Sequence, residues 1–440
     1  YSHPIAVSDN SYNYSNGFDS ITMLGVESDI TDWLKFTAQA SYKYGNSIND
    51  YFQPAKYTSE GNLRNGYGKI SNWTGQNAAI DAYLTFNKTF GDIHNINAMV
   101  GYSYEYATGR SSALASEDFI DSALGNENLG SGKAEKMRVS NSLSESELVS
   151  TMFRANYSLM DKYLFTVTAR MDGSSKFGAD NKFAFFPSGA VSWKAHNENF
   201  IKNLELFNEL KFRLSYGTSG NQGISAYQTL PRYGQQLYYY DNEWTNAIGQ
   251  GFVAAWTGPN GRIRLFEGLG APSLRWETTT QTNFGIDMGM LDNRIRLTFD
   301  IYNKRTDNLL RDGYLPPSSA FDRKKINGGT VLNKGFEITL GGDIKRSKDF
   351  NISATAIFTL NRNKLQSLGD ITSVGFNVDP KNNMAYQYWG SVPSGFRESG
   401  INILAIGQPV NVFYGFKTDG IVQSLAEGLE AGLSGDMAKA

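Results

Sequence analysis

The chain has 440 residues, with 41 basic and 43 acidic side chains and a formal net charge of −2, so it offers a polyanion no electrostatic attraction and we expect no nucleic-acid partner. It contains no cysteine and only three histidines, which excludes thiolate chemistry and gives zinc binding and Ser-His-Asp catalysis little support. We therefore expect no metal, no cofactor and no enzymatic activity. No uncharged apolar run approaches the ~18 residues of a membrane-spanning helix.

Apolar and polar residues alternate along much of the chain, and a period of two predicts β-strands. Between residues 34 and 44, for example, Leu34, Phe36 and Ala38 alternate with Lys35 and Thr37. In chain order, the twelve predicted strands cover residues 21–30, 34–44, 78–87, 95–106, 153–159, 163–172, 182–194, 210–218, 283–290, 295–304, 336–340 and 350–359.

The connections between these strands alternate in length. Short turns are predicted near residues 29–32, 88–92, 160–162, 291–293 and 345–349, with a longer connection of the same kind at 195–209. Long loops are predicted at 45–77, 107–147, 173–181, 219–279, 306–330 and 363–410. Six antiparallel hairpins of this kind place the short turns at one end of a sheet and the long loops at the other.

Alternation alone also fits a soluble β-sandwich, so strand length has to decide between the two folds. Most of the segments run for 9 to 12 residues, whereas soluble strands average about 5 to 6. Ten tilted residues rise ~25 Å, the height of an outer-membrane apolar band. Tyr42, Tyr102 and Tyr216 lie at one end of the apolar face and Trp33 and Trp193 at the other. The pattern favours an all-β, transmembrane antiparallel barrel with two aromatic girdles.

A Lys or Arg at the lipid midplane costs about 2–4 kcal/mol, so the polar face of the strands must line the lumen. The lumenal charges are then eight basic and six acidic: Lys35, Lys43, Arg154, Arg170, Lys211, Arg213, Arg296 and Lys304, with Asp81, Glu105, Asp172, Asp287, Asp300 and Glu337. This near balance fits neutral or zwitterionic solutes, a wall that packs against a plug, or cross-strand ion pairs that brace a wide barrel.

Two groups of aromatic residues in the long loops, interleaved with amides, are candidates for substrate contact. Flat rings beside amides suit the apolar faces and hydroxyls of sugars, or peptide side chains. The alternative is that the rings pack each loop against itself. The candidates are Tyr238, Tyr239, Tyr240, Trp244, Trp256, Tyr386, Tyr388 and Trp389.

Several segments, in this order, resemble the SusC/RagA-like, TonB-linked outer-membrane proteins of Bacteroidetes. They are RMDGSSKFG (170–178), FPSGAVSW (186–193), LKFRLSYGTSGNQ (210–222), WETT (276–279), NFGID (283–287), DIYNK (300–304), NKGFE (333–337) and YGFKTDGI (414–421). The motifs look structural: Gly329, Asn333, Gly335 and Glu337 are expected to set the entry of a strand, and Asp172-Gly173 a tight turn.

The resemblance implies a plugged barrel of about 22 strands, placed in the outer membrane of a Gram-negative bacterium and in contact with its lipid. It also implies import of an oligosaccharide, or less often a peptide, with a SusD-like lipoprotein over the barrel and with energy from TonB. The alternative function is a surface protein that binds glycans or mediates adhesion without transport. Residues 1–440 are then expected to form a partial receptor barrel, with the plug, the TonB box and the last strands outside this chain.

Overall fold

The computed structural model describes residues 3–121, 123–240, 243–250, 255–257, 263–265, 269–315, 323–369, 377–378, 385–389, 402–414 and 426. The chain divides into two compact units, Tyr1–Gly375 and Phe376–Ala440. The first unit contains one large sheet and three small hairpins, and the second contains a small sheet of its own.

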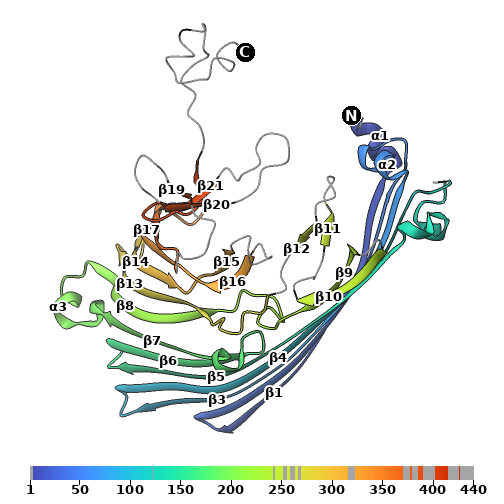
Figure 1. Cartoon of the computed structure of the whole chain (residues 1–440). Coiled ribbons are helices and arrows are strands. Elements are labelled where there is room, and N and C mark those ends of the chain that lie inside the picture. The colour runs from blue at the N-terminus through green and yellow to red at the C-terminus, as the bar shows by residue number, and fades with distance from the viewer. Residues whose placement is uncertain are drawn as a thin grey trace. The chain divides into compact units, whose positions relative to one another are not determined.

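The large sheet has twelve strands, and every pair of neighbours is antiparallel. The strands are β1 (Tyr12–Thr31), β2 (Leu34–Gln53), β3 (Tyr67–Phe90), β4 (His94–Glu117), β5 (Arg138–Leu159), β6 (Tyr163–Ser174), β7 (Phe183–Lys194), β8 (Phe207–Asn221), β13 (Glu277–Met290), β14 (Ile295–Asp307), β17 (Thr330–Arg346) and β18 (Asn351–Ser367). They follow one another in space in that order, as Figure 1 shows for the curved sheet. In the part of the chain that is described, β1 and β18 are unpaired edges, so the sheet is an open barrel wall.

The remaining elements are short. They are the hairpins β9 (Tyr233–Tyr240) with β10 (Glu243–Gln250), β11 (Ala255–Thr257) with β12 (Ile263–Leu265) and β15 (Leu310–Tyr314) with β16 (Arg323–Asn327), and in the second unit β19 (Asn377–Val378), β20 (Ala385–Trp389), β21 (Asn402–Ala405) and β22 (Val412–Phe413). The helices are α1 (Pro4–Asn10), α2 (Ser59–Arg64) and α3 (Asn199–Lys202), with 3₁₀ turns η1 (Gly125–Ser131), η2 (Ala134–Lys136), η3 (Ala179–Asn181) and η4 (Ala195–Asn197). Among the described residues, no helix has the length and hydropathy to span a membrane.

One face of the large sheet is a continuous apolar band, because the strand register aligns apolar side chains with one another. Leu214 pairs with Phe284, and the same row continues through Ile301 of β14 to β17 and β18. Val100 and Leu214 are each 54% exposed. An exposed apolar surface of this extent needs an apolar environment, which the hydrocarbon of a bilayer provides.

The predicted fold class and all twelve strands of the large sheet are confirmed, but the predicted lengths are wrong at the long-loop end. The predicted loop 45–77 shrinks to residues 54–66, because β2 continues to Gln53 and β3 begins at Tyr67. Beyond the apolar band neither face of a strand contacts lipid, so the alternation of residue types ends while the hydrogen-bonded ladder continues. The predicted turn at Asp172-Gly173 is also wrong, because both residues lie within β6.

Aromatic clusters at the long-loop end pack the loops onto the strands. Phe177, Phe186 and Trp276 form the centre of one buried cluster with Ile224 and Leu274. The indole Nε1 of Trp276 donates to the carbonyl of Lys182 at 3.0 Å, which satisfies its only polar group. These buried side chains come from β7, from the loop between β6 and β7, and from the segment between β8 and β13, so the cluster fixes where these loops leave the sheet.

At the short-turn end, Glu198 binds three residues, one each from the β5–β6 turn, β6 and β7. It accepts hydrogen bonds from Lys162 Nζ at 2.7 Å, Tyr163 Oη at 2.7 Å and Trp193 Nε1 at 3.4 Å. The bonds from Lys162 and Tyr163 lower the pKa of the Glu198 carboxyl to about 2. The carboxylate therefore anchors the connection between β7 and β8 to the turn between β5 and β6.

Introducing a positive charge tests which face contacts lipid. Ala98 and Asn97 are neighbours on β4 and point to opposite faces, so Ala98→Arg places the charge on the apolar face and Asn97→Arg places it on the polar face. We expect Ala98→Arg to destabilise the assembled full-length barrel by about 2–4 kcal/mol and Asn97→Arg to have a smaller effect. Heat-modifiable migration in gels reports assembly, and equal behaviour of the two variants would contradict the assignment of the faces.

Glu198 predicts a pH dependence of stability. Because folding lowers the pKa of this carboxyl from 4.5 to about 2, its contribution is complete above pH 4.5 and is lost as the pH falls towards 2. In urea titrations of the refolded full-length protein, Glu198→Gln should be less stable than the wild type above pH 4.5, and the difference should shrink at lower pH. The control is Glu205→Gln, because Glu205 is exposed in the same connection and has no side-chain partner among the described residues. A constant difference across this range would exclude the role of Glu198.

Candidate functional site

Four charged side chains from three neighbouring strands meet on the polar face of the sheet. Arg213 of β8 donates from Nε and Nη2 to the two carboxylate oxygens of Asp287, at 2.8 and 3.0 Å. The same Nη2 donates to Asp300 Oδ2 on β14 at 3.1 Å, and Lys211 Nζ lies 3.9 Å from Asp287. The Arg213 side chain is only 28% exposed, so water screens these bonds less than at an open surface. Arg213 therefore ties β8, β13 and β14 together.

A glycine makes this geometry possible. Gly285 is the register partner of both Arg213 and Asp300 and lies between them in the sheet. A Cβ at position 285 would lie 2.6 Å from Arg213 Cζ and 2.6 Å from Asp300 Oδ1. Any side chain here would displace the guanidinium, so Gly285 lets the arginine lie against the backbone and reach across two strands.

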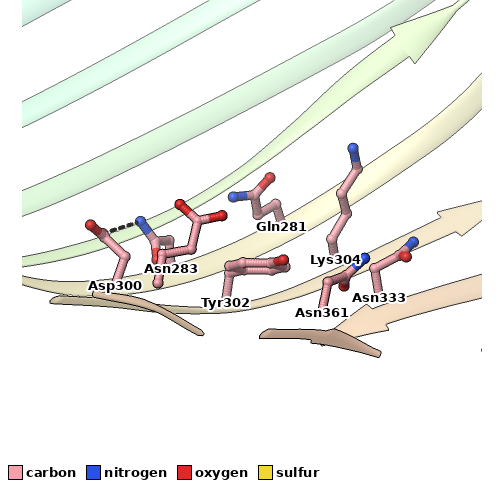
Figure 2. Close-up of a pocket in the computed structure, with 8 residues that line it drawn as sticks. Gln281, Asn283, Asp300, Tyr302, Lys304, Asn333 and Asn361 are labelled. Atoms are coloured by element: carbon pink, nitrogen blue, oxygen red, sulfur yellow. Dashed lines mark hydrogen bonds between the residues drawn. The ribbon is translucent and has the colours of Figure 1, made fainter. Parts of the chain in front are cut away.

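Next to these ion pairs is a pocket of about 540 Å³ on the polar face. It is lined by Gln281, Asn283, Asp300, Tyr302, Lys304, Asn333, Glu337 and Asn361 from β13, β14, β17 and β18. Figure 2 shows seven of these residues labelled, with the side chains of Gln281, Asn283 and Lys304 rising from the same side of the strands. Four of the eight are amides, so the wall presents many donors and acceptors and little net charge.

Several polar groups of the pocket have no protein partner among the described residues. Asn283 donates through Nδ2 to Asp300 Oδ1 at 2.9 Å, but its buried Oδ1 accepts no hydrogen bond. The carboxylate of Glu337 and the ammonium of Lys304 also lack a described partner. A buried acceptor without a partner costs about 1–3 kcal/mol, which a bound donor would recover.

Tyr302 supplies the aromatic surface of the pocket. It pairs in register with Asn283 on one side and Gly335 on the other. A Cβ at position 335 would lie 2.6 Å from Tyr302 Oη and 2.8 Å from its Cζ, so the ring lies across the strand of the glycine. The half-buried ring thus lies along the wall of the pocket between the amides and the unpaired charges.

The structure places the predicted contact residues in three separate small sheets. Tyr238, Tyr239 and Tyr240 belong to β9, and Trp244 belongs to β10. The register pairs the backbones of Trp244 and Tyr239, but the side chains of these four residues lie outside the described set. The contact role of this group stays a prediction.

The other predicted contact residues lie elsewhere. Trp256 belongs to β11, and its side chain is outside the described set. Tyr386, Tyr388 and Trp389 form most of β20 in the second unit. Tyr386 is 8% exposed and packs on Ile403, with its ring centre 5.0 Å from that of Tyr414, so it belongs to the core of that unit.

The sequence did not reveal the pocket, although it contained a signal for it. Asn333, Gly335 and Glu337 were expected to set a strand entry, whereas β17 begins at Thr330 and all three lie inside it. Gly329 alone has that role, with a φ of 103° directly before the strand. In the alternation of apolar and polar residues, four amides fall on the polar side of their strands: Gln281, Asn283, Asn333 and Asn361. Only the strand register shows that they are neighbours.

A curved antiparallel sheet with an apolar outer band and a hydrogen-bonding inner wall defines part of a transmembrane β-barrel. Residues 3–422 match the family described as TonB dependent receptor-like, beta-barrel, and the chain belongs to this family. Its members are β-barrels of the Gram-negative outer membrane, so the apolar face contacts lipid and the pocket faces the lumen.

Curated relatives and solved structures agree with this assignment. TonB-dependent receptor P3 of Formosa agariphila is 34% identical over 362 residues, which cover 82% of this chain and 33% of the relative. TonB-dependent receptor SusC of Bacteroides thetaiotaomicron is 36% identical over 224 residues, covering 50% of this chain and 21% of SusC. The structure of the RagAB peptide transporter has the same fold, with a TM-score of 0.75 and 23% identity over 95% of this chain and 42% of that one. The chain spans about a third of the length of the Formosa relative.

Removing Arg213 tests the ion pairs. Arg213→Met leaves Asp287 and Asp300 without their strongest partner, and we expect a loss of about 1–3 kcal/mol in the free energy of unfolding of the full-length protein. Adding Asp287→Asn to this variant should restore part of the loss, because it removes one of the stranded charges. Urea titration in detergent measures both effects, and a double variant less stable than Arg213→Met would contradict the pairing.

Proposed function

We propose that this chain is part of an outer-membrane importer of oligosaccharides that takes its energy from TonB and works with a SusD-like surface lipoprotein. The observation that carries the proposal is the lumenal pocket, in which amides, an aromatic ring and an unsatisfied acceptor meet on the inner wall of a membrane sheet. On this proposal the chain has no catalytic role, and its polar groups bind and release the substrate.

The chemistry of the pocket suits a sugar. Each hydroxyl of a sugar both donates and accepts, and amide side chains offer both functions at fixed spacing. The ring of Tyr302 offers the flat apolar surface that the C–H groups of a pyranose prefer. Ion pairs nearby already engage Arg213, Asp287 and Asp300, so among the charges lining the pocket only those of Glu337 and Lys304 lack a described partner.

A peptide is the second candidate, and the unpaired charges favour it. Glu337 is the register partner of Asp300, and Lys304 lies four residues further along β14, ~13 Å away along the strand. An extended peptide could place its amino group near Glu337 and its carboxylate near Lys304. A surface protein that binds glycans without transport is the third candidate, and intact binding without uptake would identify it.

Replacing Tyr302 tests the pocket in the full-length protein. In a deletion strain of the source bacterium complemented with the full-length gene, we expect Tyr302→Ala to lower oligosaccharide uptake about tenfold, equivalent to ~1.4 kcal/mol, because the ring surface is lost. The control is Ile301→Ala, the neighbouring residue on the lipid face. Uptake of fluorescently labelled linear oligosaccharides is the measurement, with peptides from a casein digest as competitors.

The same assay covers the loop residues. Replacing Tyr239 and Trp244 together by Ala should lower uptake and leave membrane insertion intact, because the two residues are register partners in the β9–β10 hairpin, outside the large sheet. Unchanged uptake would remove this hairpin from the substrate path. Competition by peptides and not by oligosaccharides would exclude the proposed substrate class.

A further inference from the structure

Trp73 on β3 has surroundings unlike those of the other tryptophans whose side chains the structure describes. Trp276 is buried, Trp33 contacts Phe86 and Trp193 stacks on Phe212. Trp73 is 45% exposed, and among the described residues neither its ring nor its Nε1 has a partner. A large aromatic side chain that is left open in this way needs an explanation.

The indole of Trp73 lies against the backbone of three glycines. Gly45 on β2, Gly75 on β3 and Gly109 on β4 are consecutive partners in one row of the sheet. A Cβ at Gly75 would lie 2.4 Å from Cη2 of the indole, one at Gly45 would lie 3.2 Å from Cζ3, and one at Gly109 would lie 3.7 Å from Nε1. The ring therefore extends over three strands. A side chain at position 75 would overlap it and one at position 45 would crowd it, whereas a Cβ at position 109 would only touch it.

The residues around the indole on the same face are small and polar. Ser47 and Ser111 are its register partners on β2 and β4, and Ser71 precedes it by two positions on β3. No side chain larger than serine occupies these three positions. The carboxylate of Asp19 on β1 also lies beside the ring, because its Oδ1 is 2.6 Å from the position of a Cβ at Gly45, and the ring itself stays 45% exposed. The site therefore combines a flat apolar surface, a free N–H and several hydroxyls.

Trp73 lies on the lumenal side of the wall and outside the membrane. It is an even number of positions from Asp81 and Thr85 on β3 and so lies on the same face of the strand. Thr85 pairs with Lys35 on the polar face. Tyr42 and Tyr106 belong to the aromatic girdle at the long-loop end of the membrane band, and both pair with Ala78 of β3. Trp73 lies five residues beyond Ala78, ~16 Å along the strand towards the long loops. A ligand entering the lumen would pass this surface before it reaches the pocket around Tyr302.

The geometry points to a second oligosaccharide site, in which the exposed face of Trp73 stacks against a sugar ring and the neighbouring serines bond its hydroxyls. This inference rests on the proposed function and adds an entry site to it. A peptide fits the surroundings less well, because in the described part of the chain no apolar pocket and no unpaired strand edge lies beside the ring. Tyr302 beside Gly335 resembles this arrangement deeper in the lumen, so at both sites an aromatic side chain lies against a glycine.

The test measures binding to the purified full-length receptor by calorimetry. The probes are maltohexaose, cellohexaose, xylohexaose and mannohexaose, with a tryptic casein digest as the peptide control. We expect Trp73→Ala to weaken binding of the hexasaccharide that the wild type binds by about tenfold, or ~1.4 kcal/mol. Trp73→Phe keeps a flat ring and should lose less affinity than Trp73→Leu, which keeps the apolar volume without the ring.

Gly75→Ala separates a binding role from simple packing. It retains the tryptophan but places a methyl group within 2.4 Å of the indole, so the ring must lift and affinity should fall. The matched control is Gly25→Ala on β1, where the nearest atom to the new methyl group is 3.9 Å away. Heat-modifiable migration confirms assembly of each variant.

The outcomes distinguish this site from the proposed import. Equal hexasaccharide affinity in the wild type, Trp73→Ala and Gly75→Ala would overturn the Trp73 site and leave oligosaccharide import in place. Binding of casein peptides alone would overturn the substrate class and the sugar site together. A wild type that binds none of the four hexasaccharides would also overturn the sugar site, while uptake by cells tests import separately.

Discussion

Everything in this molecule depends on the requirement that a strand inside a bilayer pair all its backbone N–H and C=O groups with neighbouring strands. The antiparallel ladder from β1 to β18 meets this requirement and at the same time fixes which side chains face lipid. Since a strand has a period of two, each apolar residue on the outer face is matched by one residue on the inner face. Charged, amide and hydroxyl side chains are unfavourable on the lipid face, so they lie together on the inner face of the sheet.

That wall cannot be stabilised as a protein core is, because its residues are polar and it faces a wide lumen. It is stabilised by pairs of opposite charge such as Arg213 with Asp287 and Asp300. The pairs also neutralise the field that a charge-selective pore would need, so on the proposed function recognition comes from hydrogen bonds and ring surfaces. Against this background Lys304, Glu337 and Asn283 Oδ1 are distinctive, because they contribute no described pairing to the wall.

The sequence was sufficient for the features that depend only on the alternation of apolar and polar residues. It predicted twelve strands, the two faces and the positions of the short turns, because lipid imposes alternation wherever a strand crosses the membrane. It was insufficient where lipid is absent: β3 begins at Tyr67, eleven residues before the alternation becomes visible at Ala78. It was also insufficient for the pocket, since Gln281, Tyr302 and Asn333 become neighbours only through the register of β13, β14 and β17.

Register also explains why glycines on the inner wall lie beside its largest side chains. Gly285 accommodates Arg213, Gly335 accommodates Tyr302 and Gly75 accommodates Trp73. In each case the large side chain lies along the sheet, where it offers its surface to the lumen without narrowing it. Transport needs binding that is strong enough to admit a substrate and weak enough at each position to release it. On the proposed function, shallow ring surfaces such as those of Tyr302 and Trp73 meet both conditions, whereas a single deep cavity would retain the ligand.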